Sequence, residues 1–382
     1  MNIYKPEQSE PPPAESELPD ITYVLASKVG FGHSSRAVAI LRELEQSTNV
    51  LIAAHQNVHN FIDYNLSNSH INYGYIPVHY RPEHTEAWFN NSNQDLVRLA
   101  ADSPLVINDY LRQFRFLGNT LRRTRKDQLH IGIYHSIDGY STDDFMIKKY
   151  QENYKESARN LDYLFLIEPK IEHVSSYELN GGAIVIPTDP VVRRVTKSPE
   201  IVRQEIGLAP NEDFILVQSG MSGNQYLREF VTSLAELSVN GLRLVLAPSR
   251  MPIDKDMLRA SGVTIISEAL DAHNLVNAAS GIIAKPGMQI VSEAIGYRRP
   301  LLLVDDSGPE PRLKITMVQE VIGSDLPARL DIGTNISGQI SEWIQAAPEI
   351  IEAYGRIPCD GARQIARLLP ELRDSIVMSN TA

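Results

Sequence analysis

Cysteine is almost missing from this chain: only Cys359 is present. A single thiol excludes an intrachain disulfide and a cysteine-rich metal site. The sequence also lacks an apolar run of membrane-spanning length, and its first residues have neither the basic start nor the apolar core of a signal peptide. We therefore expect a cytoplasmic protein without a transmembrane segment.

Positive charge is scarce as well. The 36 Lys and Arg residues face 47 Asp and Glu residues, so the net charge is −11, which argues against a nucleic-acid partner or an anionic membrane. One basic stretch, 112–126, is the exception. Its apolar residues have helical spacing, which favours an amphipathic helix with solvated cations, although docking to an anionic acceptor or a membrane surface stays open.

Three nucleotide and metal motifs are absent. No Gly-Lys-Ser/Thr follows a glycine loop, so a P-loop is excluded. A nicotinamide site needs an acid after the second strand, but that strand, 50–54, runs into His55-Gln56-Asn57. No Asp-x-Asp pair has a suitable context, since Asp143-Asp144 follows Ser141-Thr142 as a helix cap would. We expect no metal site and no bound cofactor.

The 382 residues, 43% of them hydrophobic, suffice for two domains of ordinary size. Strand-like runs alternate with helical ones, which predicts two doubly wound, Rossmann-like α/β domains facing a central cleft. We expect a disordered lead-in at 1–19, a first domain at 20–195, a second at 200–350, and C-terminal helices at 351–382. The predicted strands are 21–26, 51–54, 73–78, 104–108, 130–134, 163–167, 184–186, 214–218, 242–247, 263–266, 281–284 and 301–304.

The most informative turn is Gly30-Phe31-Gly32-His33, which joins the first predicted strand to a helix. Glycines allow close approach of a ligand, and the N–H groups at a helix start favour negative charge. The positive helix end favours a neutral imidazole at His33, which can act as a base. A simple tight connection is the alternative to a phosphate-binding turn.

Two further segments in the second half suit a nucleotide. The loop Ser219 to Asn224 precedes a predicted helix, and its backbone N–H groups and small polar side chains suit a diphosphate. The segment Lys285-Pro286-Gly287 begins another helix, whose start lies one turn ahead of Glu293. A carboxylate there can accept both hydroxyls of a ribose, although a solvated glutamate is the alternative.

Together, Gly-x-Gly-His, the second glycine loop and Lys-Pro-Gly followed by Glu-Ala resemble nucleotide-sugar glycosyltransferases of the GT-B type. The resemblance is to the branch of the peptidoglycan N-acetylglucosaminyltransferase and to proteins with a Gly-Phe-Gly-His-x-x-Arg motif. It extends over nearly the whole chain after the lead-in. In such relatives the last helix crosses back to the first domain, and we expect the same of the C-terminal helices here.

The resemblance implies a role for each matching position. His33 matches the catalytic base, and Asp109, at a strand end, matches the aspartate that orients it; a helix cap is the alternative for Asp109. The stretch 305–312 matches the donor-sugar contact but departs from the usual Glu-Gln or Gln-Gln pair. The expected diphosphate contacts are Gly32, Gly220, Ser222, Gly223 and Asn224. The expected nucleoside contacts are Glu268, Ala269, Leu270 and Glu293. The expected phosphate or sugar contacts are Lys285, Pro286, Gly287, Met288, Gln289, Glu310 and Arg312.

The resemblance further implies inverting transfer of a hexose from a UDP- or dTDP-sugar to a hydroxyl or amine of an acceptor. The acceptor class stays open among a sugar, a lipid-linked sugar and a natural product, and so does the oligomeric state. A nucleotide-sugar hydrolase, with water as acceptor, is the first alternative. A non-catalytic binding protein is the second, and the presence of His33 and Glu293 argues against it.

Overall fold

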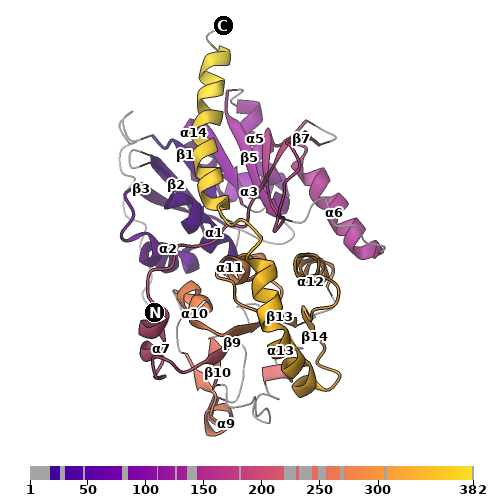
Figure 1. Cartoon of the computed structure of the whole chain (residues 1–382). Coiled ribbons are helices and arrows are strands. Elements are labelled where there is room, and N and C mark those ends of the chain that lie inside the picture. The colour runs from indigo at the N-terminus through magenta and orange to yellow at the C-terminus, as the bar shows by residue number, and fades with distance from the viewer. Residues whose placement is uncertain are drawn as a thin grey trace.

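The structure is a computed structural model of the whole chain (Figure 1). It describes residues 18–25, 31–45, 48–79, 85–109, 111–124, 127–135, 144–179, 182–218, 229–231, 243–247, 255–266, 271–304 and 308–380. Two β-sheets, one in each half of the chain, form its framework. We call the parts built on them the first and the second domain.

The first domain contains an eight-stranded sheet in the order β3-β2-β1-β4-β5-β6-β8-β7. All neighbouring strands are parallel except β7 and β8. Helices cover both faces, so the central strands are buried Val, Ile and Leu runs. The strands are β1 Ile21–Val24, β2 Asn49–Ala54, β3 Asn72–Pro77, β4 Leu105–Asn108, β5 Leu129–His135, β6 Tyr163–Ile167, β7 Tyr177–Glu178 and β8 Ile184–Thr188. The helices are α1 Gly32–Leu41, η2 Gln56–Val58, α2 His59–Leu66, α3 Glu86–Ser92, α4 Gln94–Asp102, α5 Leu111–Thr124 and α6 Phe145–Ala158.

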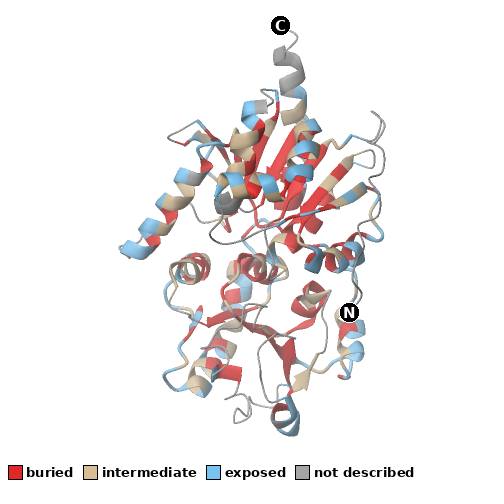
Figure 2. Ribbon diagram, turned by 180° about the vertical axis from the view of Figure 1, so that it is seen from behind, coloured by how far each residue is buried: buried red, intermediate tan, exposed pale blue. Residues whose placement is uncertain are grey.

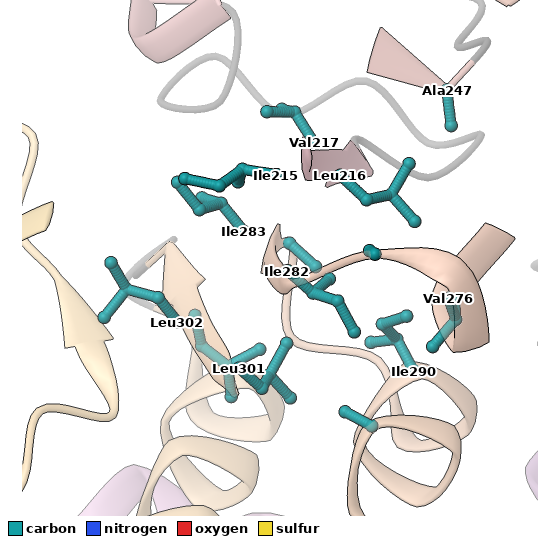
Figure 3. Close-up of a cluster of buried hydrophobic side chains, with 14 of the residues drawn as sticks. Ile215, Leu216, Val217, Ala247, Val276, Ile282, Ile283, Ile290, Leu301 and Leu302 are labelled. Atoms are coloured by element: carbon teal, nitrogen blue, oxygen red, sulfur yellow. The ribbon is translucent and has the colours of Figure 1, made fainter. Parts of the chain in front are cut away.

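The second domain contains a six-stranded parallel sheet in the order β11-β10-β9-β12-β13-β14. Figure 3 shows its core, in which β9, β12 and β13 contribute Ile215, Ile282 and Leu301 and helix α11 contributes Ile290. The strands are β9 Phe214–Gln218, β10 Arg243–Ala247, β11 Thr264–Ile265, β12 Gly281–Ala284, β13 Leu301–Val304 and β14 Arg329–Leu330. The helices are α7 Pro199–Glu205, α9 Lys255–Ala260, α10 Ala272–Ala278, α11 Met288–Gly296, α12 Pro309–Ile322 and α13 Ile336–Tyr354.

The chain passes between the domains twice. Residues 189–198 lead from β8 to α7, and residues 355–360 lead from α13 to the last helix, α14 Gly361–Asn380. Figure 1 shows α14 lying along the first domain. Ala362, Ile365 and Leu369 of α14 are buried in the same hydrophobic cluster as β1 and α1.

Helices of the second domain also pack on the first. Met288 of α11 and Leu313 and Met317 of α12 are buried in the first domain's hydrophobic cluster. In Figure 2 both helices show buried segments where they lie between the two sheets. The carboxyl ends of β1 and β12, which lead to α1 and α11, therefore meet at the junction of the domains.

The two Rossmann-like α/β domains confirm the predicted fold class. Helix α5 has Leu117 and Leu121 buried, as the amphipathic interpretation of the basic stretch predicted. Asp144 caps α6, because its side chain accepts hydrogen bonds from the N–H groups of Met146 (2.8 Å) and Ile147 (3.3 Å). Of the helices that the structure describes, none is both long and apolar enough to cross a membrane. The domain bounds and the cytoplasmic location stay predictions.

Candidate functional site

A cluster of charged side chains surrounds Asp109 at the carboxyl end of β4. His33 and Arg36 reach it from the first turns of α1, and Tyr23 reaches it from β1. The His33 Nδ1 atom lies 3.2 Å from Asp109 Oδ1, and Arg36 Nε donates to both carboxylate oxygens at 2.8 and 3.1 Å. Tyr23 donates its hydroxyl to Oδ2 at 3.0 Å. Asp109 is thus a buried acceptor shared by several donors.

Charge pairing keeps Asp109 ionised. Burial alone raises the pKa of the carboxyl, but the Arg36 charge and the hydrogen bond from His33 outweigh it and hold the pKa below its usual value. Burial and the same carboxylate raise the pKa of Tyr23, so its hydroxyl stays a donor. Arg36 is buried, whereas the His33 side chain is 25% exposed. Of these groups, His33 is the one that a ligand can reach.

The orientation of His33 depends on which ring nitrogen carries the proton. With the proton on Nδ1, this atom donates to Asp109, and Nε2 carries the lone pair that a base needs. With the proton on Nε2, the Arg36 Nη2 group, 3.0 Å away, donates to Nδ1 instead. A hydrogen bond to Asp109 therefore favours the tautomer whose Nε2 is unprotonated, and a hydrogen bond from Arg36 favours the other tautomer.

The starts of α1 and α11 face each other at this site. A Cβ atom added to Gly32 would lie 4.0 Å from Gln289 Cβ, so the first turns of the two helices almost touch. The residues at the N-cap positions, Phe31 and Gly287, make no side-chain hydrogen bond to these helix starts. The positive dipole ends of both helices point to the same region, which suits an anion.

Around Gly32 and Gln289 lie further predicted contacts. Lys285, Pro286 and Gly287 form the turn between β12 and α11, and the buried Met288 begins the helix. The N–H of Lys285 donates to the Gln218 carbonyl of β9 at 3.2 Å, which fixes the turn at the sheet edge. The backbone is therefore held where both helix starts meet.

Helix α12 adds a second charged group. Glu310 pairs with Lys314 one turn later, and this ammonium is the main cause that lowers the pKa of Glu310 to about 2. His135, at the end of β5, lies within reach of both charges; burial first, then Lys314, lowers its pKa well below the usual value. Arg312 instead pairs with Asp144 of the first domain at 2.7 Å.

Glu293, the predicted ribose contact, is buried on α11 in an ion pair. Arg193 of the first interdomain connection donates to its two carboxylate oxygens at 2.7 and 3.2 Å, and Gln289 donates to Oε1 at 2.8 Å. The Arg193 guanidinium also lies 5.6 Å from the centre of the Phe61 ring, which stacks on Phe31. Both carboxylate oxygens of Glu293 thus already accept hydrogen bonds.

Seven predicted site residues lie outside the described residues, as does Gly30 of the first turn. These are Gly220, Ser222, Gly223, Asn224, Glu268, Ala269 and Leu270.

Arg36 and Arg193 are among the site residues that were given no role from the sequence. Arg36 lies three positions after His33, on the same face of a helix, and this spacing was a usable signal. Arg193 lies 100 positions from Glu293, and no local pattern connects the two.

The order of the strands, the doubly wound sheets and the returning last helix define a GT-B architecture. No model of a known protein family matches the sequence, and no curated protein matches it either. Solved structures do match over nearly the whole chain. Arabidopsis thaliana UGT89C1, solved with quercetin, is 12% identical with a TM-score of 0.63, and the match covers 94% of this chain and 99% of that one.

Two more solved glycosyltransferases are similar to the same extent. Phytolacca americana UGT2, solved with UDP-2-fluoro-glucose and pterostilbene, is 14% identical with a TM-score of 0.63, covering 94% of this chain and 100% of that one. CalG4, the calicheamicin glycosyltransferase, is 14% identical with a TM-score of 0.58, covering 96% and 100%. The chain has the GT-B fold.

Proposed function

We propose that this protein transfers a sugar from a nucleoside diphosphate sugar to a hydroxyl or amine of an acceptor. The observation that carries the proposal is the position of His33, which is bonded to Asp109 and lies where the starts of α1 and α11 meet. In this proposal a base lies beside an anion site, in a fold that this chain shares with a protein solved with UDP-2-fluoro-glucose.

In this mechanism His33 takes the proton of the acceptor. Asp109 holds the ring with the proton on Nδ1 and stabilises the imidazolium that forms after Nε2 accepts the second proton. The acceptor oxygen or nitrogen attacks the anomeric carbon as the bond to the diphosphate breaks. Attack opposite the leaving group inverts the anomeric centre.

The departing diphosphate moves to the helix starts. Their N–H groups and the positive dipole ends stabilise negative charge that develops on the leaving oxygen. Gly32 on one side and Gly287 to Gln289 on the other allow the backbone to approach the phosphates closely. The predicted loop contacts Gly220, Ser222, Gly223 and Asn224 complete this group in the proposal.

Glu293 binds the ribose hydroxyls after exchanging one partner. Its carboxylate is held by Arg193, so nucleoside binding replaces part of an existing ion pair. The UDP affinity of Glu293→Gln therefore separates the ribose role from a structural one. In the ribose role, Glu293→Gln weakens UDP binding about tenfold or more, whereas Arg193→Met, which leaves the carboxylate in place, weakens it less.

The sugar contacts are assigned to Glu310 on α12, with Lys314 beside it. Glu310 stays ionised at neutral pH and can accept hydrogen bonds from sugar hydroxyls. Arg312 is the second predicted contact, and it must leave Asp144 to reach a sugar.

The decisive experiment is a nucleotide screen followed by turnover. UDP, dTDP, ADP and GDP are tested for thermal stabilisation, and the corresponding glucose donors are then incubated with and without hydroxylated aromatic or sugar acceptors. His33→Ala should lower turnover by about 10²–10⁴-fold while UDP affinity changes less than about tenfold. Asp325→Ala, in an exposed turn of the second domain, is the control.

The products distinguish the open alternatives. Free sugar formed without an acceptor assigns hydrolysis, and the anomeric configuration of a transfer product tests inversion. If no nucleotide stabilises the protein, both enzymatic proposals fail and the binding-protein alternative gains support.

A further inference from the structure

A cavity of about 640 Å³ lies behind the candidate site, at the other end of α1. Its wall includes Arg42, Glu43 and Glu45 after α1 and the segment 68–71 of the first domain. It also includes residues 192–194 and 196 of the first interdomain connection, and residues 359–360 and 362–363, where the second connection joins α14. Helix α1 has ten residues, so about 15 Å separates this cavity from Gly32. The volume lies within the range of small-molecule sites, about 300–1,000 Å³.

Arg42 is a half-buried arginine in the wall of this cavity. Its guanidinium donates to the Asn65 carbonyl, and among the residues that the structure describes no carboxylate contacts it. Burial first, then the charges of Arg193 and Arg194, lowers the pKa of Arg42. The charges that act on this guanidinium are therefore positive.

The other arginines of the wall already have carboxylate partners. Arg194 and Arg363 share Glu43 at 3.3 and 3.6 Å, and Arg363 also pairs with Asp360 at 3.3 Å. Glu45 is exposed. Arg193 is held by Glu293, yet its Nη1 atom is buried without a hydrogen-bond partner among the described residues. Among the described residues, Arg42 is thus the wall arginine that has no carboxylate partner.

We propose that this cavity binds a phosphate-class dianion, either free phosphate or the phosphate group of a small metabolite. Guanidinium groups match phosphate oxygens in pairs, and a doubly charged anion suits a place where Arg42, Arg193 and Arg194 repel one another. Arg42 and Arg194 hold the anion, and Arg193 contributes its charge. Since both interdomain connections line the cavity, the bound anion stabilises the domain arrangement described here.

Thermal unfolding tests this site without any nucleotide or acceptor, so the result does not depend on the proposed transfer reaction. The full chain is titrated with sodium phosphate against sodium chloride at constant ionic strength, and in a second arm with glucose 1-phosphate. A ligand that binds only the folded state raises the Tm in a saturable way. The two arms distinguish free phosphate from a phosphorylated metabolite.

Variants locate the binding. Arg42→Gln and Arg194→Gln should weaken the apparent phosphate affinity by about tenfold or more, whereas Arg159→Gln, an exposed arginine at the end of α6, should not change it. Arg194 is 71% exposed, so its replacement leaves the fold intact even if the Arg42 variant is unstable. The proposal is overturned if no saturable rise occurs in either arm, or if Arg42→Gln and Arg194→Gln respond like the unmodified chain, which would assign the phosphate to another site.

Discussion

At the scale of single residues, Asp109 decides how His33 can act. Its carboxylate is buried and accepts from Tyr23 and Arg36, and His33 Nδ1 lies 3.2 Å from Oδ1. The arginine balances the charge, so the carboxylate needs no solvent to stay ionised. The same arginine lies 3.0 Å from His33 Nδ1, so the tautomer of the histidine depends on Arg36 as well as on Asp109.

Asp109→Asn leaves the Arg36 guanidinium buried without its counter-charge. Removing one partner of a buried ion pair costs about 3–5 kcal/mol of unfolding free energy. Urea denaturation of Asp109→Asn, Arg36→Met and the double variant measures the coupling. The double variant should lose less unfolding free energy than the two single variants together. Additive losses of unfolding free energy would mean that the two side chains do not interact.

The lowered pKa of Asp109 also predicts a pH dependence. Because the carboxyl binds its proton less readily in the folded protein than in the unfolded chain, its contribution is complete above the unfolded pKa, about 3.9, and is lost as the pH falls. The difference in unfolding free energy between the unmodified chain and Asp109→Asn should thus shrink as the pH drops below about 4. Urea titrations at pH 7, 5 and 3 measure it, and a constant difference would contradict the assignment.

Part of this site was predictable from the sequence. His33 and Asp109 each follow a hydrophobic strand, and parallel strands bring their carboxyl ends to one edge, so their proximity could be expected. The pairing of Glu293 with Arg193 could not, since it depends on how the connection between the domains folds back onto α11. The position of Glu293 on a predicted helix did not decide whether its side chain contacts a ribose or solvent.

At the scale of elements, α11 connects the candidate site with the interdomain connection. Its first turn faces Gly32, its middle carries Glu293, and its last residue, Gly296, lies against Val192. Tyr297, just beyond the helix, donates its hydroxyl to the Arg193 carbonyl at 2.6 Å. The helix and residues 192–193 are thus packed as one unit.

Gly296→Ala should destabilise the protein, although alanine normally favours a helix. The new Cβ would lie 2.6 Å from Val192 Cγ2, and such overpacking costs about 1–3 kcal/mol. Thermal or urea unfolding measures the effect. Adding Val192→Ala should relieve it, and Gly74→Ala, where nothing lies within 4 Å of the new Cβ, is the control. A Gly296→Ala variant as stable as the unmodified chain would show that the connection shifts freely.

The helices and strands differ in how well the sequence predicts them. Predicted strands such as 163–167 and 214–218 coincide with β6 and β9, because buried parallel strands are unbroken apolar runs. Strands β7 and β14 were missed. Each has two residues, Tyr177–Glu178 and Arg329–Leu330, too few to show a period, and they exist because a neighbouring strand offers a partner edge.

At the scale of the whole molecule, hydrogen bonds of Asp189 join the first interdomain connection to the end of the second one. Its Oδ2 accepts from the Gln364 side chain at 2.9 Å and from the Asp360 N–H at 3.2 Å, while His173 Nε2 lies 2.9 Å from Oδ1. The Asp189 N–H donates to Gln364 Oε1 at 3.0 Å. One buried carboxylate thus ties the first connection to the start of α14.

Asp189→Ala should loosen this junction more than either sheet. Leaving buried donors without an acceptor costs about 1–3 kcal/mol, and hydrogen exchange at 360–364 should accelerate relative to the β-strands. Hydrogen-exchange mass spectrometry measures the effect, with Asp325→Ala in an exposed turn as the control. Uniform acceleration over the chain would instead indicate global destabilisation.

The returning helix α14 sets an order for folding during synthesis. Domains usually fold as the ribosome releases them, amino-terminal domain first. Here Ala362, Ile365 and Leu369, which close the core beside β1 and α1, are translated after the entire second domain. The first domain therefore leaves the ribosome with part of its apolar core uncovered, and its final packing step comes last, when the second domain is already complete.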